Sequence, residues 1–244
     1  MEIIIPNWPA PQRVKAFAST RCDGFSQGAY QGLNLGTHVG DDIQTVRKNR
    51  LALEEYANMP QAPIWLNQTH STHVLNVDRA TPTSEIFDAD GAFSNSIGVV
   101  CAAMMADCLP VLLTNAQGTQ VAAVHAGWRG LANGIVENAV EKFDGEVLAW
   151  IGPAIGVQAF EVGSDVVDAF TAVIPEAKKA FMAKATEGKW LADMNMLVTQ
   201  RLNRVGVSQI YYSNLCTYDD PQRFYSYRRD GITGRQATFI WIDN

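Results

Sequence analysis

Apolar positions divide the chain into alternating predicted strands and helices. In the first 40 residues, short apolar runs at 3–5 and 14–18 alternate with turns that contain Gly and Asn, a pattern typical of short strands. The pair Asp41-Asp42 then precedes apolar positions at helical spacing, so a helix capped by this pair is predicted. Its apolar positions are Val46, Leu53 and Tyr56.

The segment from 64 to 126 is the richest in predicted strands, and we expect the central sheet there. Its apolar runs are IWLNQ (64–68), HVLNV (73–77), GVVCAAMMA (98–106), PVLLTN (110–115) and QVAAVHA (120–126). The sequence NAQG at 115–118 predicts a tight turn between the last two strands.

Helices and strands alternate in the second half. A helix is predicted to open at 127–130, a second to carry Val162, Val166, Val167 and Phe170, and a third to begin at Asp193. Strands are predicted at 147–152, 209–214, 224–230 and 236–242. No repeat or linker separates these elements, so we expect a single mixed α/β (α+β) domain over residues 1–244, with sheets covered by helices.

Composition agrees with an ordered protein of the cytoplasm. Hydrophobic residues make up 47% of the 244 and charged residues 18%, which is unlike the composition of disordered chains. The N-terminus lacks the basic and cleavage regions of a signal peptide. The longest nearly apolar stretch, 97–105, is far shorter than the roughly 20 residues of a membrane span. The four cysteines contain no CxxC pair, which favours free thiols in a reducing compartment.

Charge argues against nucleic acid as a partner. The net charge is −6, and no run of five or more Lys or Arg occurs. One local concentration of arginines is interleaved with aromatic residues and comprises Arg223, Arg228, Arg229 and Arg235. An RNA contact would use such a cluster, but in an acidic chain it favours a small anionic ligand.

Two histidines and a cysteine at predicted strand ends form the strongest candidate site. His70 closes IWLNQTH, Cys108 lies in the turn MADCLP, and His125 ends the strand QVAAVHA. Strand ends that meet in a sheet would bring these side chains into one pocket. Two neutral imidazoles and one thiolate suit a catalytic zinc site with a fourth position open.

Packing roles compete with this interpretation. A buried His or Cys taken alone is more often a core residue than a ligand. Cys101 is flanked by Val and Ala inside a strand and is predicted to be core, whereas Cys22 and Cys216 are ordinary loop thiols. His73 begins the next strand and is expected to face solvent.

The sequence GWRG after His125 is a candidate anion site. Its glycines expose backbone N–H groups at a helix N-terminus, and Arg129 adds a positive charge. Equally, the glycines only permit a tight strand-to-helix turn. Asp107 is either a proton carrier, a partner of a ligand imidazole or a turn cap, and Glu161 is a further possible acid/base.

Taken together, eight segments resemble the family of laccase-domain purine nucleoside phosphorylases, which includes polyphenol oxidases and the peptidoglycan editing factor. The segments are STRCDGFS, LNLGTHVGDD, WLNQTHSTHV, DADGAFS, MMADCLPVLL, AAVHAGWRGL, IGPAIGVQAFEVG and FYSYRRDGITGRQATFIW, which cover almost the whole chain in order. The family's metal-binding catalytic residues match His70, Cys108 and His125.

The resemblance implies a layered α/β/β/α fold and a zinc-dependent enzyme. It implies that adenosine, inosine and methylthioadenosine are cleaved with phosphate to free base and (methylthio)ribose 1-phosphate, with an associated adenosine deaminase activity. Its partners would be a purine nucleoside and phosphate. Phosphorolysis needs an anion pocket at the ribose C1′, and we assign phosphate or ribose contacts to Arg21, Arg129 and Arg228 as hypotheses.

Three other functions are compatible with the same residues. Two His and one Cys also bind Cu²⁺, although a laccase needs many more histidines than the four in this chain. Cys108 could instead be a nucleophile with His125 as its base, in a hydrolase that acts on cell-wall precursors. A non-catalytic nucleotide-binding module is the third alternative. The oligomeric state stays open.

Overall fold

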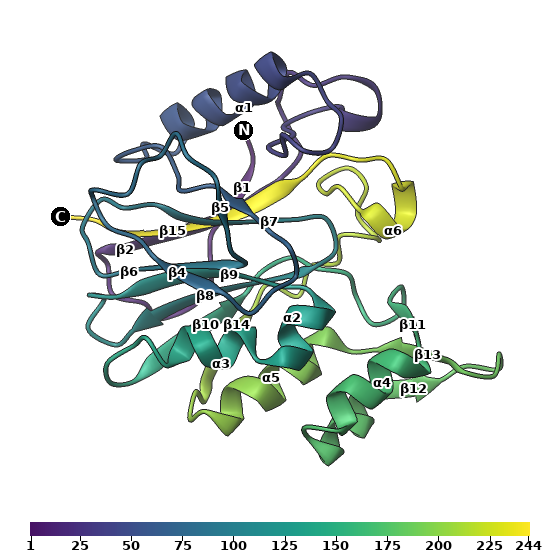
Figure 1. Cartoon of the computed structure of the whole chain (residues 1–244). Coiled ribbons are helices and arrows are strands. Elements are labelled where there is room, and N and C mark those ends of the chain that lie inside the picture. Colours follow the sequence, from purple (N-terminus) through teal and green to yellow (C-terminus); the bar gives the residue numbers. More distant parts are fainter.

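Two β-sheets packed face to face form the centre of the molecule (Figure 1), and the computed structural model describes residues 1–244. The smaller sheet is antiparallel, with strand order β1-β2-β15-β7. Its strands are β1 (Ile3–Ile4), β2 (Val14–Ser19), β15 (Gln236–Ile242) and β7 (Cys101–Met105). The C-terminal strand therefore lies in the middle of a sheet that the N-terminal strand begins.

The larger sheet has six strands in the order β14-β10-β8-β9-β6-β4. They are β14 (Gln209–Tyr212), β10 (Val147–Ile151), β8 (Leu109–Asn115), β9 (Val121–Ala126), β6 (Gly91–Ser94) and β4 (Val74–Asn76). The outer pairs are parallel and the inner ones antiparallel. The predicted tight turn joins β8 to β9, where Gly118 takes a positive φ of 66° and the Asn115 side chain accepts the backbone N–H of Thr119 at 2.8 Å.

Helices cover the outer face of each sheet. Helix α1 (Ile43–Tyr56) lies over the small sheet, and Asp42 caps it by accepting the N–H of Thr45 at 2.8 Å. On the far side, the large sheet is covered by α2 (Trp128–Asn133), α3 (Ile135–Val140) and α5 (Met194–Arg204). The layer order is thus α/β/β/α, which confirms the expected fold class.

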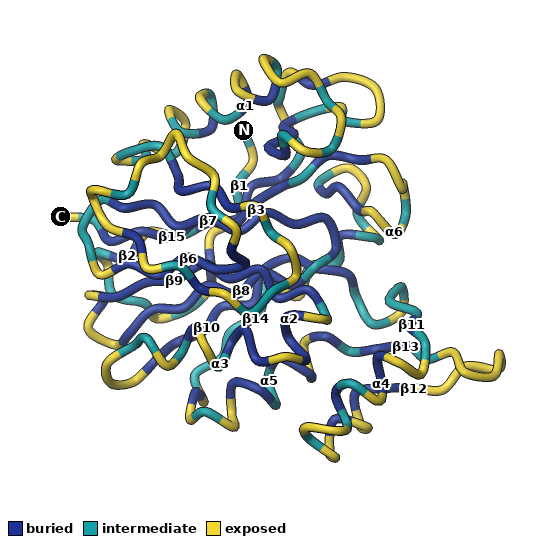
Figure 2. The backbone as a smooth tube through the Cα atoms, in the orientation of Figure 1, coloured by how far each residue is buried: buried dark blue, intermediate teal, exposed yellow.

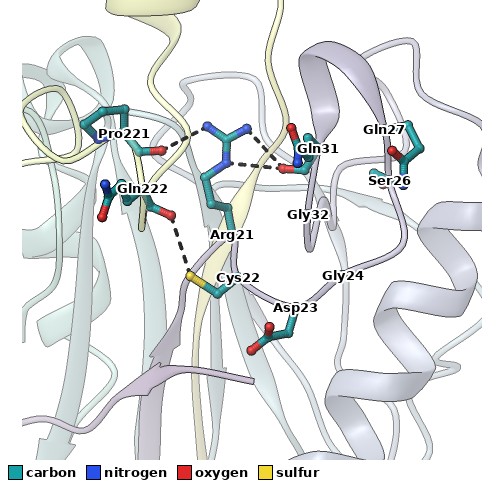
Figure 3. A pocket seen from close by; sticks show the side chains of 10 residues that line it. All are labelled: Arg21, Cys22, Asp23, Gly24, Ser26, Gln27, Gln31, Gly32, Pro221 and Gln222. Atoms are coloured by element: carbon teal, nitrogen blue, oxygen red, sulfur yellow. Dashed lines mark hydrogen bonds between the residues drawn. The ribbon is translucent and has the colours of Figure 1, made fainter.

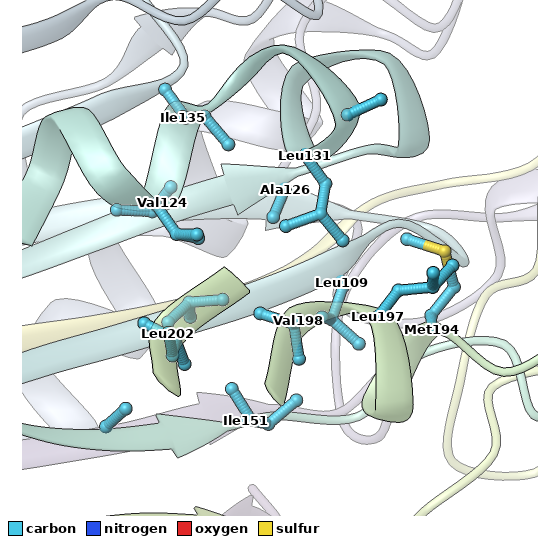
Figure 4. Close-up of a cluster of buried hydrophobic side chains, with 14 of the residues drawn as sticks. Leu109, Val124, Ala126, Leu131, Ile135, Ile151, Met194, Leu197, Val198 and Leu202 are labelled. Atoms are coloured by element: carbon cyan, nitrogen blue, oxygen red, sulfur yellow. The ribbon is translucent and has the colours of Figure 1, made fainter. Parts of the chain in front are cut away.

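Buried residues concentrate in the strands of the two sheets (Figure 2), and three clusters of apolar side chains fill the spaces between the layers. Alternate residues of one strand enter different spaces: Val111 and Leu113 of β8 face the helices, whereas Leu112 faces the small sheet. Figure 4 shows the helix side, where Leu197 and Val198 of α5 pack over the sheet. Because both faces of the central strands are covered, β8, β9 and β10 are buried at every position and are mainly apolar instead of alternating.

The remaining elements are short. They are a three-stranded sheet of β11 (Glu161–Gly163), β13 (Lys189–Ala192) and β12 (Phe181–Ala183), helix α4 (Ser164–Thr171), the 3-10 turns η1 (Gly28–Tyr30) and η2 (Pro175–Ala180), the pair β3 (Leu66–Asn67) and β5 (Phe87–Asp88), and α6 (Tyr227–Asp230). No helix combines the length and apolar character that crossing a bilayer requires.

Three predicted elements differ from the structure. The helix that opens at 127–130 stops at Gly134, whose φ of +100° breaks it into α2 and α3. Val162 belongs to β11, and the helix starts only at Ser164. The predicted strand 224–230 is a loop followed by α6, because the Ser226 hydroxyl accepts the N–H of Arg229 at 3.2 Å and caps a helical turn.

The packing between the two sheets can be tested with Leu112→Ala. Leu112 is fully buried there, so we expect the cavity to lower the free energy of unfolding by about 2–5 kcal/mol. The matched change Leu51→Ala lies on α1 at a residue that is 60% exposed, and we expect an effect within about 0.5 kcal/mol. Urea denaturation followed by circular dichroism measures both; equal losses would contradict this view of the core.

Candidate metal centre

His70, Cys108 and His125 come together at one end of the sandwich. Their possible ligand atoms all lie within 4.8 Å of one another. The pairing of β8 with β9 brings Pro110 opposite His125, so Cys108, just before β8, lies beside that histidine. His70 follows β3 in a left-handed backbone conformation with a φ of 61°. The structure thus brings the three candidate residues together in one cluster.

Strand alternation explains the direction of the His125 side chain. Ala122 and Val124 of β9 face the helices, whereas Val121 and Ala123 face the small sheet. His125 continues the second series, so its ring lies on the side of the small sheet and is only 4% exposed. At this position the apolar filling ends and polar side chains take over.

Asp90, which the sequence analysis did not select, holds both histidines. Its carboxylate accepts the Nδ1 hydrogen of His125 at 2.8 Å and the backbone N–H of His70 at 3.0 Å. The same group accepts the N–H of Thr69 and both the N–H and the hydroxyl of Ser71. Burial acts to raise the pKa of Asp90, but the hydrogen bonds from His125 and Ser71 outweigh it and lower this pKa to about 2.

This contact leaves Nε2 of His125 free for a ligand. A carboxylate on Nδ1 fixes the tautomer and orientation of a metal-binding imidazole, which is the usual partner of such a histidine. The sequence marks Asp90 only by its place in DADG, directly before the apolar strand β6. Asp107 adjoins Cys108 in the sequence, whereas Asp90 reaches the cluster only through the fold.

The Cys108 thiol and the His125 ring stabilise each other's charged form. Burial acts to raise the pKa of Cys108, but the charge of His125 and the hydrogen bonds from both histidines outweigh it and lower this pKa to about 6. Reciprocally, and against burial, the Cys108 charge and the Asp90 contact raise the pKa of His125 to about 9. The group of three therefore stabilises a positive charge next to a thiolate.

The donor set fits a zinc ion. Sγ of Cys108 and Nε2 of His70 are 3.7 Å apart. Tetrahedral Zn–S and Zn–N bonds imply a separation of about 3.6 Å between such atoms. Gly127 makes this closeness possible, because a Cβ there would stand 2.5 Å from Cδ2 of His70 and 3.3 Å from Sγ of Cys108. Two nitrogens and one sulfur leave a fourth position for water or substrate.

The three residues line a cavity of about 420 Å³. Its other lining residues are His38, Gln68, Met104, Met105, Ala106, Tyr227 and Arg235. Gln68 is fully used by the fold, because its amide donates to the carbonyl of Met104 and accepts that residue's N–H, both at 2.8 Å. A cavity of this size suits a small organic molecule.

The three arginines assigned from the sequence lie outside this cavity. Arg21 donates from all its guanidinium nitrogens to the carbonyls of Gln31 and Pro221, in a separate polar pocket (Figure 3). Arg129 is exposed and stacks on Trp128. Arg228 donates to the carbonyls of residues 159 and 161.

The two acidic candidates also serve the fold. Asp107 accepts the hydroxyl of Thr217 and the backbone N–H of Arg228, each at 2.7 Å, so it anchors the start of α6 and touches neither ligand imidazole. Glu161 lies in β11 and pairs with Lys184. The His73 side chain forms no hydrogen bond with His70, Cys108 or His125. Its Nδ1 lies 2.9 Å from the carbonyl oxygen of Asp88.

Comparison with known proteins assigns the chain that carries this cluster to a family. The sequence profile of a family described as "Multi-copper polyphenol oxidoreductase laccase" matches residues 15–243. The chain belongs to this laccase-like family. The resemblance seen in the sequence motifs is thereby confirmed.

Within the laccase-like family, close relatives span the whole chain. A protein of Haemophilus influenzae named "Purine nucleoside phosphorylase" is 46% identical, with 100% of each chain covered. The Escherichia coli protein named "Purine nucleoside phosphorylase YfiH" is 48% identical over 99% of each. A crystal structure of a Neisseria meningitidis protein matches with a TM-score of 0.94 at 46% identity, again over 100% of both chains.

The contribution of Asp90 can be tested by Asp90→Asn. An amide cannot accept all the hydrogen bonds that hold the two histidines, so we expect the affinity for Zn²⁺ to fall about 10- to 100-fold. Asp88→Asn is the matched control, because Asp88 lies two residues away and bonds only Asn67 and His73. Competition with a chromophoric chelator measures both affinities; an unchanged affinity in Asp90→Asn would refute the role.

Proposed function

We propose that this protein is a zinc-dependent purine nucleoside phosphorylase. It cleaves adenosine, inosine and methylthioadenosine with phosphate, and it also deaminates adenosine. The observation that carries the proposal is the cluster of His70, Cys108 and His125 facing a cavity of about 420 Å³. Relatives at 46% and 48% identity over their full length, named purine nucleoside phosphorylases, support the substrate class.

The metal ligands in this proposal are His70, Cys108 and His125. When bound, zinc supplies a Lewis acid and lowers the pKa of water toward neutrality. Asp90 keeps His125 in the tautomer that presents Nε2 to the cavity, and it ties the 69–71 segment so that His70 faces the same point. The protein thus prepares the ligands before a metal or substrate arrives.

The two reactions place different demands on the cavity. In phosphorolysis, a phosphate oxygen forms a bond to C1′ as the bond from C1′ to the purine N9 breaks; the electron pair leaves with the base, which is then protonated. In deamination, a water oxygen bonds to the purine C6 and ammonia leaves. Both need the nucleoside held away from bulk water, and the first needs an anion held beside the ribose.

A copper-dependent polyphenol oxidase is the second candidate, because the matching family carries that description. Cu²⁺ also accepts a two-histidine, one-cysteine set. A multicopper centre needs further histidines, whereas of the remaining two, His73 is bonded to the Asp88 carbonyl and only His38 lines the cavity. The residues therefore favour a single-metal site and nucleoside chemistry.

We also propose a cytoplasmic location. All four cysteines are free thiols in the folded protein, as expected for a reducing compartment.

Product analysis tests the proposed activity. We expect adenosine with phosphate to yield adenine, inosine, hypoxanthine and ribose 1-phosphate, and His125→Ala to lower kcat at least about 100-fold, because one ligand of the metal is lost. His73→Ala should retain the activity, since His73 is exposed and bonds only a backbone carbonyl. Chromatography identifies the products. The proposal would be refuted if the unaltered protein formed none of them.

Metal removal separates the zinc enzyme from its rivals. We expect a chelator to abolish phosphorolysis and Zn²⁺ to restore it, because the three ligands hold the metal but do not replace its chemistry. Metal content and oxygen uptake with a phenol are measured in parallel. Stoichiometric copper with steady oxygen uptake would favour the oxidase, and activity indifferent to the chelator but lost on thiol alkylation would favour a Cys108 nucleophile.

A further inference from the structure

The cavity of the candidate metal centre is lined by one arginine, Arg235. Arg201, Arg223 and Arg229 each form an ion pair with a carboxylate. Arg235 forms none. A cation that faces a cavity without a carboxylate partner is available to bind an anion there.

Two of the three guanidinium nitrogens of Arg235 form no hydrogen bond within the protein. Only Nη1 is used within the protein, donating to the carbonyls of Thr233 at 3.1 Å and Gly234 at 2.9 Å. Neither Nε nor Nη2 has a protein acceptor. These are the two nitrogens that together can donate two parallel hydrogen bonds to one phosphate.

The stem of Arg235 is held in place from both sides. Its backbone N–H donates to the Asn34 side chain at 2.8 Å, and its carbonyl accepts the N–H of Leu35 at 2.9 Å. Gly36 packs so closely that an added Cβ would stand 2.8 Å from Cγ of Arg235. The guanidinium therefore starts from a fixed base at the cavity wall, as a positioned ligand group needs.

A second guanidinium group, that of Arg50, lies close to His38 and Arg235 on this side of the cavity. His38 lines the same cavity, and burial together with the charges of Arg235 and Arg50 lowers its pKa. Arg50 itself is occupied, since Nε and Nη2 both donate to the carbonyl of Leu35 and the group stacks 3.7 Å over Trp65. Arg50 thus contributes a positive charge near the cavity, whereas Arg235 also retains N–H donors that no protein group accepts.

We propose that Arg235 is the phosphate-binding residue of this cavity, where it receives inorganic phosphate through Nε and Nη2 beside the cluster of His70, Cys108 and His125. This assignment replaces the expectation for Arg21, Arg129 and Arg228, whose guanidinium groups lie outside the cavity. It rests on the proposed function for the identity of the anion as a co-substrate, but the binding of phosphate itself does not depend on it.

Steady-state kinetics with varied phosphate test the assignment. We expect Arg235→Gln to raise the KM for phosphate about 10- to 100-fold through loss of a charged double hydrogen bond, with the KM for the nucleoside nearly unchanged. Arg235→Lys keeps the charge but not the fork, so it should recover part of the loss. The control is Arg79→Gln, an exposed arginine that donates to the carbonyl of Ile97. An unchanged KM for phosphate in Arg235→Gln, or a rise in Arg228→Gln instead, would overturn the assignment.

A measurement on the unaltered protein covers the case in which a variant fails to fold. Arginine-selective dicarbonyl labelling, read by mass spectrometry, should modify Arg235, and inorganic phosphate should protect it while leaving Arg79 unprotected. Absence of protection would refute phosphate binding. Protection without any phosphorolysis would keep the anion site and reject the phosphorylase.

A nucleoside 5′-monophosphate presents the same chemical group, so its binding is measured as well. If Arg235→Gln lost affinity for adenosine 5′-monophosphate but kept its KM for phosphate, the guanidinium would serve a nucleotide and the co-substrate assignment would be wrong.

Discussion

One buried carboxylate organises the functional end of this protein. Asp90 accepts hydrogen bonds from the 69–71 segment and from the ring of His125, so a single group sets the positions of two histidines, one in the loop after β3 and one in β9. Its burial would be unfavourable for a charge, and these hydrogen bonds compensate for the lost water. The same contacts that stabilise Asp90 therefore align the possible metal ligands.

The layered architecture explains why the cluster lies where it does. Between the sheets, apolar side chains from both sides exclude water, as with Leu112 of the six-stranded sheet and Ile240 of the four-stranded one. At the end where β8 and β9 meet the loop of His70, polar residues replace this filling and leave an open cavity. The rigid strands fix Cys108 and His125, while the loop contributes His70 through its left-handed backbone and the glycine space at residue 127.

Arginines illustrate how one residue type serves two purposes. Arg21 links segments that are far apart in the sequence. It donates to the carbonyls of Gln31 and Pro221 and stacks 4.5 Å from the centroid of the Tyr225 ring. It holds the N-terminal loop to the C-terminal segment, and each of its three guanidinium nitrogens already donates to a carbonyl. Arg235 is connected to the N-terminal loop through its backbone, by the bonds to Asn34 and Leu35, and its guanidinium uses only Nη1, on the carbonyls of Thr233 and Gly234, so Nε and Nη2 stay free. Partner count, rather than position in a motif, separates the two.

The sequence by itself determined the mixed α/β class and most strands, its family resemblance implied the layered α/β/β/α order, and its motifs selected the cluster of His70, Cys108 and His125. Apolar periodicity reports burial directly, and His70, Cys108 and His125 were marked by their places at strand ends as well as by family motifs. The tertiary structure decided the role of Asp90, the helical turn at α6 and the arginine that faces the cavity. These depend on hydrogen bonds between distant segments, such as Asp107 with the N–H of Arg228, and local spacing carries no information about such partners.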